Sequence, residues 1–239
     1  MGKMVRVMGT MMSQPTRAVL WTCQLMDVPV EFQIVDVSKG EHLTKEYLSI
    51  NPTAKFPILK DGDFCLWESH AIMRYVAQKH IKAVDHLYPL DLQLRGKVDQ
   101  WLDWKHSFLR PGAAGIVRRL VMSKLMKDIS NHSMRYDLVE IPEEREARLL
   151  NQSLQVMEQQ LSKTTYIAHS SSFTLADIAL TTEIEQLSLL PCDQPPPFGS
   201  DLSTYPNIKR WLDAMRKVEG HERVHETLNK AIAKTHSKT

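Results

Sequence analysis

Two short stretches of this chain combine residue types that suit the binding of an anion or a thiol. The first is Ser13-Gln14-Pro15-Thr16, in which a hydroxyl precedes a proline at the start of a helical pattern. Such a hydroxyl stands beside the unpaired amides and the positive dipole end of a helix. A thiol bound there would have a lowered pKa, because its thiolate would gain a hydrogen bond and the dipole. Spacing alone favours the simpler role of Ser13 as a helix cap.

The second stretch is Glu68-Ser69, which joins a predicted strand to a predicted helix at residues 70–79, with Ser69 as the N-cap. An acid and a hydroxyl side by side suit an amino-acid head group. Ser69 and the helix amides would take its carboxylate, and Glu68 its ammonium. The pair alone favours a structural interpretation, since caps and acidic residues are common at helix starts.

Other chemistries lack the motifs that they need. The ten histidines show no H-E-x-x-H spacing, and the three cysteines, Cys23, Cys65 and Cys192, form no C-x-x-C pair. No G-x-S-x-G elbow surrounds a serine, so a hydrolase is not indicated. His106 and Arg110 lie one helical turn apart, where they could face a cleft, although most such pairs are only solvated. We therefore expect no metal and no disulfide framework.

The first 82 residues predict a small α/β domain, at residues 3–82, that holds both stretches. Strand patterns occupy residues 3–8, 31–37, 58–60 and 64–67, and helical patterns occupy residues 16–27, 44–50 and 70–79. The leading strand–helix–strand unit predicts a parallel pair with a right-handed crossover. Asp61-Gly62-Asp63 predicts an antiparallel hairpin. Phe56-Pro57, just before it, is a place where a cis peptide is often retained.

After a linker at residues 80–90 the strand signals almost vanish, and residues 90–234 predict an all-helical domain. Helices are expected at residues 91–127, kinked or split at Pro111-Gly112, and at 142–162, 175–190, 205–219 and 222–234. Thr174 and Asp177 have the spacing of a capping box at the start of one of them. Residues 128–141 and the run Pro195-Pro196-Pro197 predict a mobile connection and a stiff loop.

Composition places the chain among ordinary globular proteins. It has 239 residues, 43% of them hydrophobic, and 30 basic residues against 28 acidic ones, a net charge of +2. This balance gives no electrostatic reason to expect nucleic acid as a partner. No apolar run approaches the length that spans a bilayer, and the first residues lack the core of a signal peptide. We expect a cytoplasmic protein that binds neither nucleic acid nor membrane.

These residues also carry a family resemblance. In its order of motifs the chain resembles the cytosolic glutathione transferases, most closely the theta class, over essentially its full length. The matching blocks are Ser13-Gln14-Pro15-Thr16-Arg17-Ala18-Val19, Asn51-Pro52 through Phe56-Pro57, Asp61-Gly62-Asp63 through Ile72, Trp101-Leu102-Asp103-Trp104 through Gly112, and Thr174-Leu175-Ala176-Asp177.

The resemblance implies a thioredoxin-like N-terminal domain that binds glutathione as co-substrate, followed by an all-helical domain that lines most of the second-substrate pocket. The glutathione-binding residues would be Gln14, His42, Lys55, Phe56, Pro57, Glu68 and Ser69. Ser13 would be the catalytic residue, donating a hydrogen bond to the glutathione sulfur. Met11, Met12 and Arg110 would face a small-molecule electrophile. The resemblance further implies a homodimer.

Two classes of function compete on these grounds. The first is an enzyme that activates glutathione for attack on electrophilic carbon, halogenated carbon included, or for peroxide reduction. The second is a non-catalytic binding or assembly module with the same fold, which the fold alone does not separate from the enzyme. Ser13, Glu68 and Ser69 together favour the enzyme. A redox variant with a catalytic cysteine is disfavoured, because position 13 is serine and Cys23 lies inside a predicted helix.

Overall fold

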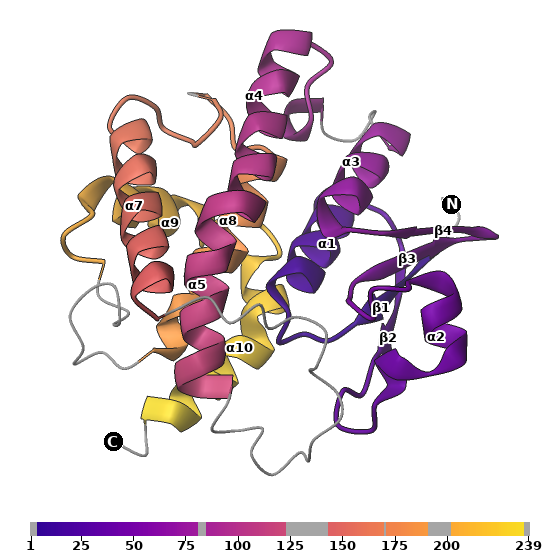
Figure 1. Cartoon of the computed structure of the whole chain (residues 1–239). Helices are drawn as coiled ribbons and strands as arrows, with labels where there is room; N and C mark the ends of the chain where they lie inside the picture. Colours follow the sequence, from indigo (N-terminus) through magenta and orange to yellow (C-terminus); the bar gives the residue numbers. More distant parts are fainter. Residues whose placement is uncertain (1–3, 81–84, 123–142, 170, 191–201, 237–239) are drawn as a thin grey trace.

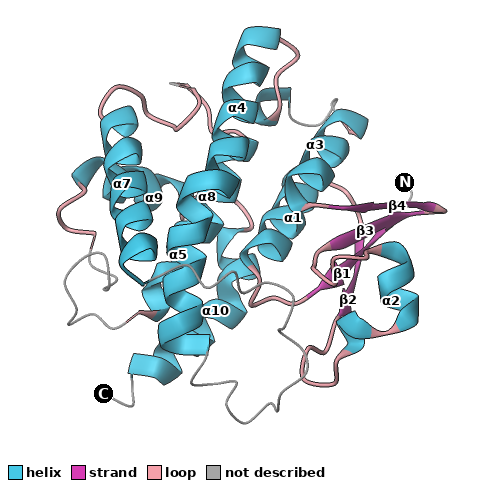
Figure 2. Ribbon diagram, in the orientation of Figure 1, coloured by secondary structure: helices cyan, strands magenta, loops and turns pink. Residues whose placement is uncertain are grey.

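A mixed four-stranded sheet and a bundle of helices lie side by side in the chain (Figure 1, Figure 2). The computed structural model describes residues 4–80, 85–122, 143–169, 171–190 and 202–236. The sheet part contains β1 (Val5–Gly9), α1 (Gln14–Leu25), β2 (Val30–Ile34), the 3₁₀-turn η1 (Glu41–Leu43), α2 (Lys45–Ile50), β3 (Ile58–Asp61), β4 (Phe64–Trp67) and α3 (Ser69–Lys79). This is the order of strands and helices that the sequence predicts.

The strand order is β2-β1-β3-β4, with β1 parallel to β2 and antiparallel to β3. Alternation along the strands separates two apolar faces. Val7 and Leu59 are cross-strand partners and belong to the main core, which α1 and α3 cover. Met8 and Ile58, the next pair, pack in a second cluster with Tyr47 of α2. The sheet is therefore covered on both faces, with α1 and α3 placed between it and the helical bundle (Figure 1).

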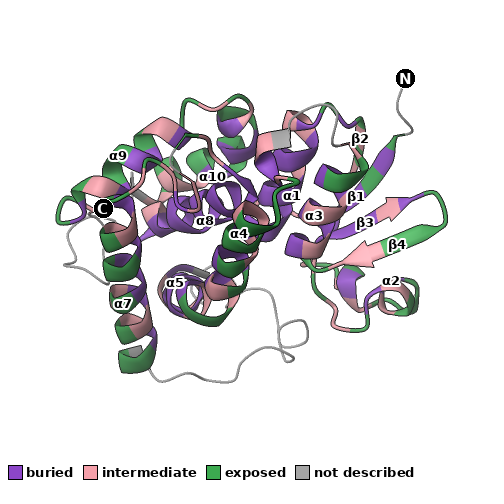
Figure 3. Cartoon of the chain, turned by 90° about the horizontal axis from the view of Figure 1, so that it is seen from above, coloured by how far each residue is buried: buried purple, intermediate pink, exposed green. Residues whose placement is uncertain are grey.

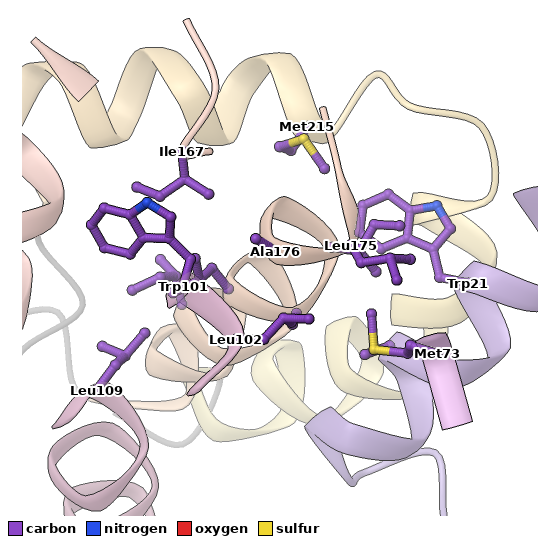
Figure 4. Close-up of a cluster of buried hydrophobic side chains, with 14 of the residues drawn as sticks. Trp21, Met73, Trp101, Leu102, Leu109, Ile167, Leu175, Ala176 and Met215 are labelled. Atoms are coloured by element: carbon purple, nitrogen blue, oxygen red, sulfur yellow. The ribbon is translucent and has the colours of Figure 1, made fainter. Parts of the chain in front are cut away.

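The helical part packs around α8. Its elements are the 3₁₀-turn η2 (Asp85–Leu87), α4 (Leu92–Trp104), the π-turn η3 (Lys105–Leu109), α5 (Arg110–Val117), the π-turn η4 (Arg118–Met122), α7 (Glu143–Leu161), α8 (Leu175–Glu185), the 3₁₀-turn η5 (Gln186–Leu189), α9 (Pro206–Met215) and α10 (His221–His236). Every residue of α8 is buried, whereas α7 turns an exposed face outward (Figure 3). Side chains from both parts of the chain, Trp21 and Met73 among them, gather near Leu175 and Ala176 at the start of α8 (Figure 4).

The capping box at the start of α8 is confirmed. The Asp177 carboxylate accepts from the Thr174 amide at 2.9 Å and from the Thr174 hydroxyl at 3.0 Å. Its other oxygen accepts from the Ile167 amide at 2.7 Å and from the Trp211 indole at 2.8 Å. Because Asp177 is fully buried, these bonds from three separate segments lock the helical part together.

The helix that the sequence expects at 91–127 is interrupted, but not where the sequence predicts. The break lies in η3, ahead of Pro111, which stands in the first turn of α5. Proline lacks an amide hydrogen and its ring crowds the carbonyl four residues earlier, so the turn before it widens and the chain continues as a helix. The predicted kink or split at Pro111-Gly112 thus lies earlier in the chain and takes the form of a π-turn at Lys105–Leu109.

Some predicted features lie outside the described residues. These are the connection at 128–141, the run Pro195-Pro196-Pro197, the end of the helix expected at 91–127, and part of the linker at 80–90. Among the helices that are described, none is both long enough and apolar enough to cross a membrane.

Candidate active site

The sheet register brings three loops to one edge. Met8 pairs with Ile58, and Ile58 pairs with Trp67, so the end of β1, the start of β3 and the end of β4 lie next to one another. The segments that follow or precede these positions are the turn at residues 10–13, the loop at residues 51–57 and the junction at residues 68–69. Two stretches that the sequence singles out, Ser13 and Glu68-Ser69, therefore meet at the same end of the sheet as Phe56-Pro57.

Ser13 is the N-cap of α1. Its backbone is extended, its amide donates to the Thr10 carbonyl at 3.0 Å, and its Oγ accepts from the Thr16 amide at 3.3 Å. The predicted cap role of Ser13 is thus confirmed. A hydroxyl that accepts from the helix keeps its own proton available for donation. Since Ser13 is only partly buried, that proton can be offered to a ligand at the helix start.

Gly9 permits the close approach of α1 to the end of β1. A Cβ atom at Gly9 would lie 2.6 Å from the Thr16 hydroxyl oxygen, closer than any real contact. A larger residue there would push the first turn of α1 away from the sheet. The turn that carries Ser13 is therefore fixed by its contact with Gly9 as well as by its own hydrogen bonds.

The loop before β3 is built around Asn51 and ends in the cis peptide Phe56-Pro57, as the sequence predicts. The Lys55 carbonyl accepts from the Tyr47 hydroxyl and from the Asn51 amide, both at 2.7 Å. His42 of η1 is buried and meets the Phe56 ring edge-on, with 6.5 Å between ring centroids. His42, Lys55 and Phe56 are thus held in one neighbourhood, with the Lys55 side chain exposed.

The junction after β4 differs from its prediction. α3 begins at Ser69, and the N-cap position belongs to Glu68, whose side chain makes no capping hydrogen bond. The prediction of Ser69 as the N-cap is therefore wrong. Glu68 has φ 73°, a conformation that costs energy for a residue other than glycine and that often marks a functional site. The chain turns sharply there, which leaves the Glu68 carboxylate exposed and Ser69 buried in the first turn of the helix.

Gln14 and Arg110 meet at a carboxylate that the sequence analysis did not single out. Glu183 of α8 is fully buried and accepts from the Arg110 guanidinium at 2.9 Å and from the Gln14 amide at 3.4 Å. The buried Lys105 ammonium lies 3.0 Å from the same carboxylate. Burial acts to raise the pKa of Glu183, but the charges of Lys105 and Arg110 outweigh it, and the pKa lies below its usual value.

Two histidine rings pack against each other beside this cluster, tilted by 40°. His70, in the first turn of α3, is buried, and its ring lies 4.1 Å from that of His106 in η3. Burial, reinforced by the neighbouring positive charge of Lys105, lowers the pKa of His70 far below its usual value and that of His106 to about 4. Both rings are therefore neutral at neutral pH, and His106 packs against α3 as well as lying one turn from Arg110.

Met11 and Met12 lie in the turn before Ser13 and are partly buried. They are therefore next in the chain to Ser13, on the turn that ends at the start of α1. Within the described ranges, no group of three or more histidine, cysteine, aspartate or glutamate side chains could hold a metal ion.

Glu183 and Lys105 were missed by sequence reasoning. A signal for Glu183 exists in the run Leu175–Glu185, where apolar and small residues stand on all sides of the helix, because a charge in such a helix must be buried and paired. The partners themselves lie far away in sequence: Lys105 and Arg110 are on another helix, and Gln14 is 169 residues from Glu183. No local pattern links them.

The fold and the site together define a thioredoxin-like domain joined to a helical domain, with a polar site at the sheet edge. Residues 5–78 match the family model for the glutathione S-transferase N-terminal domain, and residues 120–219 match that for the C-terminal domain. Human glutathione S-transferase theta-1 is 31% identical over 229 residues, covering 92% of this chain and 87% of the human protein. The chain belongs to the glutathione S-transferase family.

Other similarities agree with this assignment. Arabidopsis thaliana glutathione S-transferases T2 and T3 are each 32% identical over 95% of this chain, which spans 37% of the length of either protein. Human glutathione transferase theta-2, solved in complex with glutathione and an unknown ligand, has a TM-score of 0.78 and 28% identity, covering 98% of this chain and 91% of that one. Poplar glutathione transferase F1 has a TM-score of 0.78 at 26% identity, covering 96% of this chain and 100% of that one. The predicted family, theta-class likeness and fold class are confirmed.

Proposed function

We propose that this chain is a glutathione transferase, which binds glutathione at the sheet edge and activates its thiol as a thiolate. The observation that carries the proposal is the meeting of the Ser13 hydroxyl, the Phe56-Pro57 peptide and Glu68-Ser69 at one end of the sheet. A peptide-like ligand with an amino-acid head group and a thiol matches these three features in type and order. A non-catalytic module could bind the same ligand through Phe56-Pro57 and Glu68-Ser69, but only activation of the thiol calls for the Ser13 hydroxyl beside them.

The ligand would be held at both ends. Glu68 would pair with the γ-glutamyl ammonium, while Ser69 and the first amides of α3 would receive the γ-glutamyl carboxylate. The Phe56 backbone would pair with the cysteinyl part, as an added strand does. His42 and Lys55 would lie at the glycyl carboxylate. Because the Gln14 side chain donates to Glu183, we assign Gln14 to the support of Ser13.

The chemistry follows from the position of Ser13. The glutathione thiol gives its proton to solvent, and the thiolate accepts a hydrogen bond from the Ser13 hydroxyl at the start of α1. The sulfur then attacks an electrophilic carbon, a carbon–sulfur bond forms, and the leaving group departs with its electron pair. With a peroxide, the oxygen–oxygen bond breaks instead, and a second glutathione completes the reduction to glutathione disulfide, an alcohol and water.

The second substrate would lie between Met11, Met12 and Arg110. Methionine side chains adapt to varied apolar shapes. Arg110 keeps 31% of its side chain exposed while it bonds to Glu183, so its guanidinium can face both the buried carboxylate and a ligand. In that place it would stabilise a leaving anion. The class of substrate is a small electrophile with an apolar body.

We further propose a cytoplasmic homodimer. Trp104, Phe108 and Val156 line a groove of about 410 Å³ between η3 and α7, and the Phe108 and Val156 side chains are 49% and 42% exposed. Exposed apolar side chains beside such a groove suit contact with a second copy.

The two cysteines in the described residues are free thiols, which suits a reducing compartment such as the cytoplasm. Light scattering of Phe108→Ser beside the wild type tests the dimer: the variant should be monomeric, and an unchanged mass would remove this face from the interface.

The test of function is an ultraviolet titration of the glutathione thiolate in complex with the protein, across pH. We expect wild-type protein to lower the pKa of the bound thiol by roughly two units, which corresponds to about 2.7 kcal/mol. Ser13→Ala should return that pKa close to its value in water while glutathione remains bound. Asp91→Ala, which removes the N-cap of α4, is the control for the loss of a cap and should leave the thiol pKa unchanged. If wild-type protein binds glutathione without forming thiolate, the chain is a binding module.

A further inference from the structure

A buried guanidinium joins the turn before Ser13 to the helical domain. Arg17 of α1 has 0% of its surface exposed. Its Nη1 donates to the Met11 carbonyl at 3.0 Å and to the Met12 carbonyl at 3.1 Å. Its Nη2 donates to the Thr182 carbonyl at 3.2 Å and to the Gln186 side-chain oxygen at 2.7 Å. One side chain thus spans the active-site turn and the end of α8.

The bonds on the turn act directly on Ser13. The Met12 carbonyl belongs to the peptide group whose nitrogen is the Ser13 amide, and that amide donates to the Thr10 carbonyl. Holding this peptide plane fixes the direction in which the Ser13 side chain leaves the backbone. The Gln186 amide oxygen in turn fixes the guanidinium, because it makes the shortest of the four bonds. The geometry of Ser13 therefore depends on a residue of the helical domain.

The arrangement is costly in stability. Burial lowers the pKa of Arg17 to about 10, although the charges of Glu183 and Glu185 act to raise it, so the group remains charged at neutral pH. The Arg17 Nε is buried and has no acceptor within the described part of the chain. An apolar side chain in this place would avoid both penalties. A buried cation with one unsatisfied donor, in a place that an apolar side chain could fill, suits a role other than stability.

We propose that Arg17 is a positioning residue for Ser13, and that Gln186 completes this device from the helical domain. Through it, the contact between the two domains sets how strongly the Ser13 hydroxyl stabilises the thiolate of bound glutathione. This inference rests on the proposed function. Arg17 touches neither the thiol nor the electrophile, because it is fully buried and both of its Nη atoms donate to protein oxygens.

The test uses two variants of different severity. Arg17→Lys keeps the positive charge but offers a single donor group, which cannot bond to both segments with the fork geometry of a guanidinium. Gln186→Met removes only the side-chain acceptor at the start of η5 and leaves the Thr182 carbonyl of α8 in place. In the ultraviolet titration, we expect the acid dissociation constant of the bound glutathione thiol to fall roughly three- to tenfold in Arg17→Lys, which is a rise of about 0.5–1 in the thiol pKa. Gln186→Met should give a smaller fall, with glutathione affinity little changed in both.

A double-mutant cycle separates positioning from general damage. In the Ser13→Ala background, Gln186→Met should cause no further change in the thiol pKa, because the effect passes through Ser13. Arg210→Lys is the control for the loss of a guanidinium fork: Arg210 of α9 is exposed and also donates to several carbonyls, those of Leu161, Thr164 and Thr165, but to none in the turn before Ser13. It should leave the thiol pKa unchanged. His225, a titratable neighbour of Arg17, has its pKa lowered to about 3 mainly by burial and does not titrate in this range.

The outcomes distinguish the two proposals. If Ser13→Ala leaves the thiol pKa unchanged, the proposed function fails and this inference fails with it. If Ser13→Ala raises the thiol pKa but Gln186→Met and Arg17→Lys do not, the transferase mechanism stands and Arg17 is only structural. If Gln186→Met raises the thiol pKa by the same amount in the Ser13→Ala background as in wild type, the effect does not pass through Ser13 and the positioning role is overturned.

Discussion

The two ends of α8 each bury a carboxylate, and they do so in opposite ways. Asp177, at the start, is surrounded by neutral donors: two amides, a hydroxyl and an indole. Glu183, near the end, is surrounded by the charged groups of Lys105 and Arg110. Burial raises the pKa of Asp177 and its hydrogen bonds only partly offset this, whereas the nearby cations leave the pKa of Glu183 below its usual value.

This difference separates architecture from site. The partners of Asp177 all belong to the helical part, so its role is to hold that part together. The partners of Glu183 include Gln14, which directly follows the proposed catalytic serine. A carboxylate that joins two domains beside a binding site is placed to affect the ligand, while one inside a single domain affects stability alone. The predictions below test this division.

The largest effect is expected from Glu183→Leu. It leaves the fully buried Lys105 ammonium without its partner, which should cost about 3–5 kcal/mol of unfolding free energy in urea titrations. Adding Lys105→Met should restore stability to within about 1–2 kcal/mol of wild type, because an apolar pair of similar volume avoids the desolvation penalty. If the double variant is as unstable as the single one, the charge of Lys105 is not the cause.

A smaller loss is expected from Asp177→Asn. The amide keeps one acceptor oxygen but turns an NH₂ group toward donors, so at least one buried amide or indole donor loses its acceptor. We expect a loss of about 2 kcal/mol in urea unfolding, with the thiol pKa of bound glutathione unchanged in the folded protein. A raised thiol pKa in this variant would contradict the division between the two carboxylates.

The smallest and most discriminating effect is on the acid dependence of stability. The pKa of Glu183 is lowered, so as pH falls below about its ordinary value of 4.5 the unfolded chain takes up the proton first and stability is lost. The pKa of Asp177 is raised above its ordinary value of 3.8, so the folded chain takes up that proton first and acidification toward 3.8 favours folding. Glu183→Gln should therefore make the acid loss of stability shallower, and Asp177→Asn should make it steeper. Urea midpoints measured from about pH 6 to about pH 3 check both slopes. If the two variants change the wild-type slope in the same direction, the assignment is contradicted.

Much of the sheet part could be predicted from the sequence, because its turns and caps are determined by residues that are close together in the chain. The Ser13 cap, the cis peptide at Phe56-Pro57 and the hairpin at Asp61-Gly62-Asp63 each depend on residues within a few positions of one another. The alternation of apolar residues then sets the faces of the sheet. The capping box of Thr174 and Asp177 was predictable for the same reason.

The parts that sequence reasoning missed depend on long-range partners or on unusual backbone. Glu68 adopts φ 73°, a conformation that its residue type does not signal, and this moved the helix start to Ser69. Arg110 was expected to face only the electrophile, but Glu183, which it bonds, lies 73 residues further along the chain. Arginine on a helix is usually exposed, so nothing in the local sequence predicts that Arg17 is buried. Its burial follows from the packing of α8 against α1.

The π-turn at Lys105–Leu109 allows Lys105 and Arg110 to reach the same carboxylate, that of Glu183. In a regular α-helix, residues 105 and 110 would point about 140° apart. Here the Arg110 amide donates to the Lys105 carbonyl, a bond over five residues, which brings the two positions back toward the same side. The length of this segment, more than the identity of its middle residues, is what encodes the arrangement. Removing a single residue between Lys105 and Arg110 would rotate one cation out of reach, so the turn should tolerate substitutions far better than deletions.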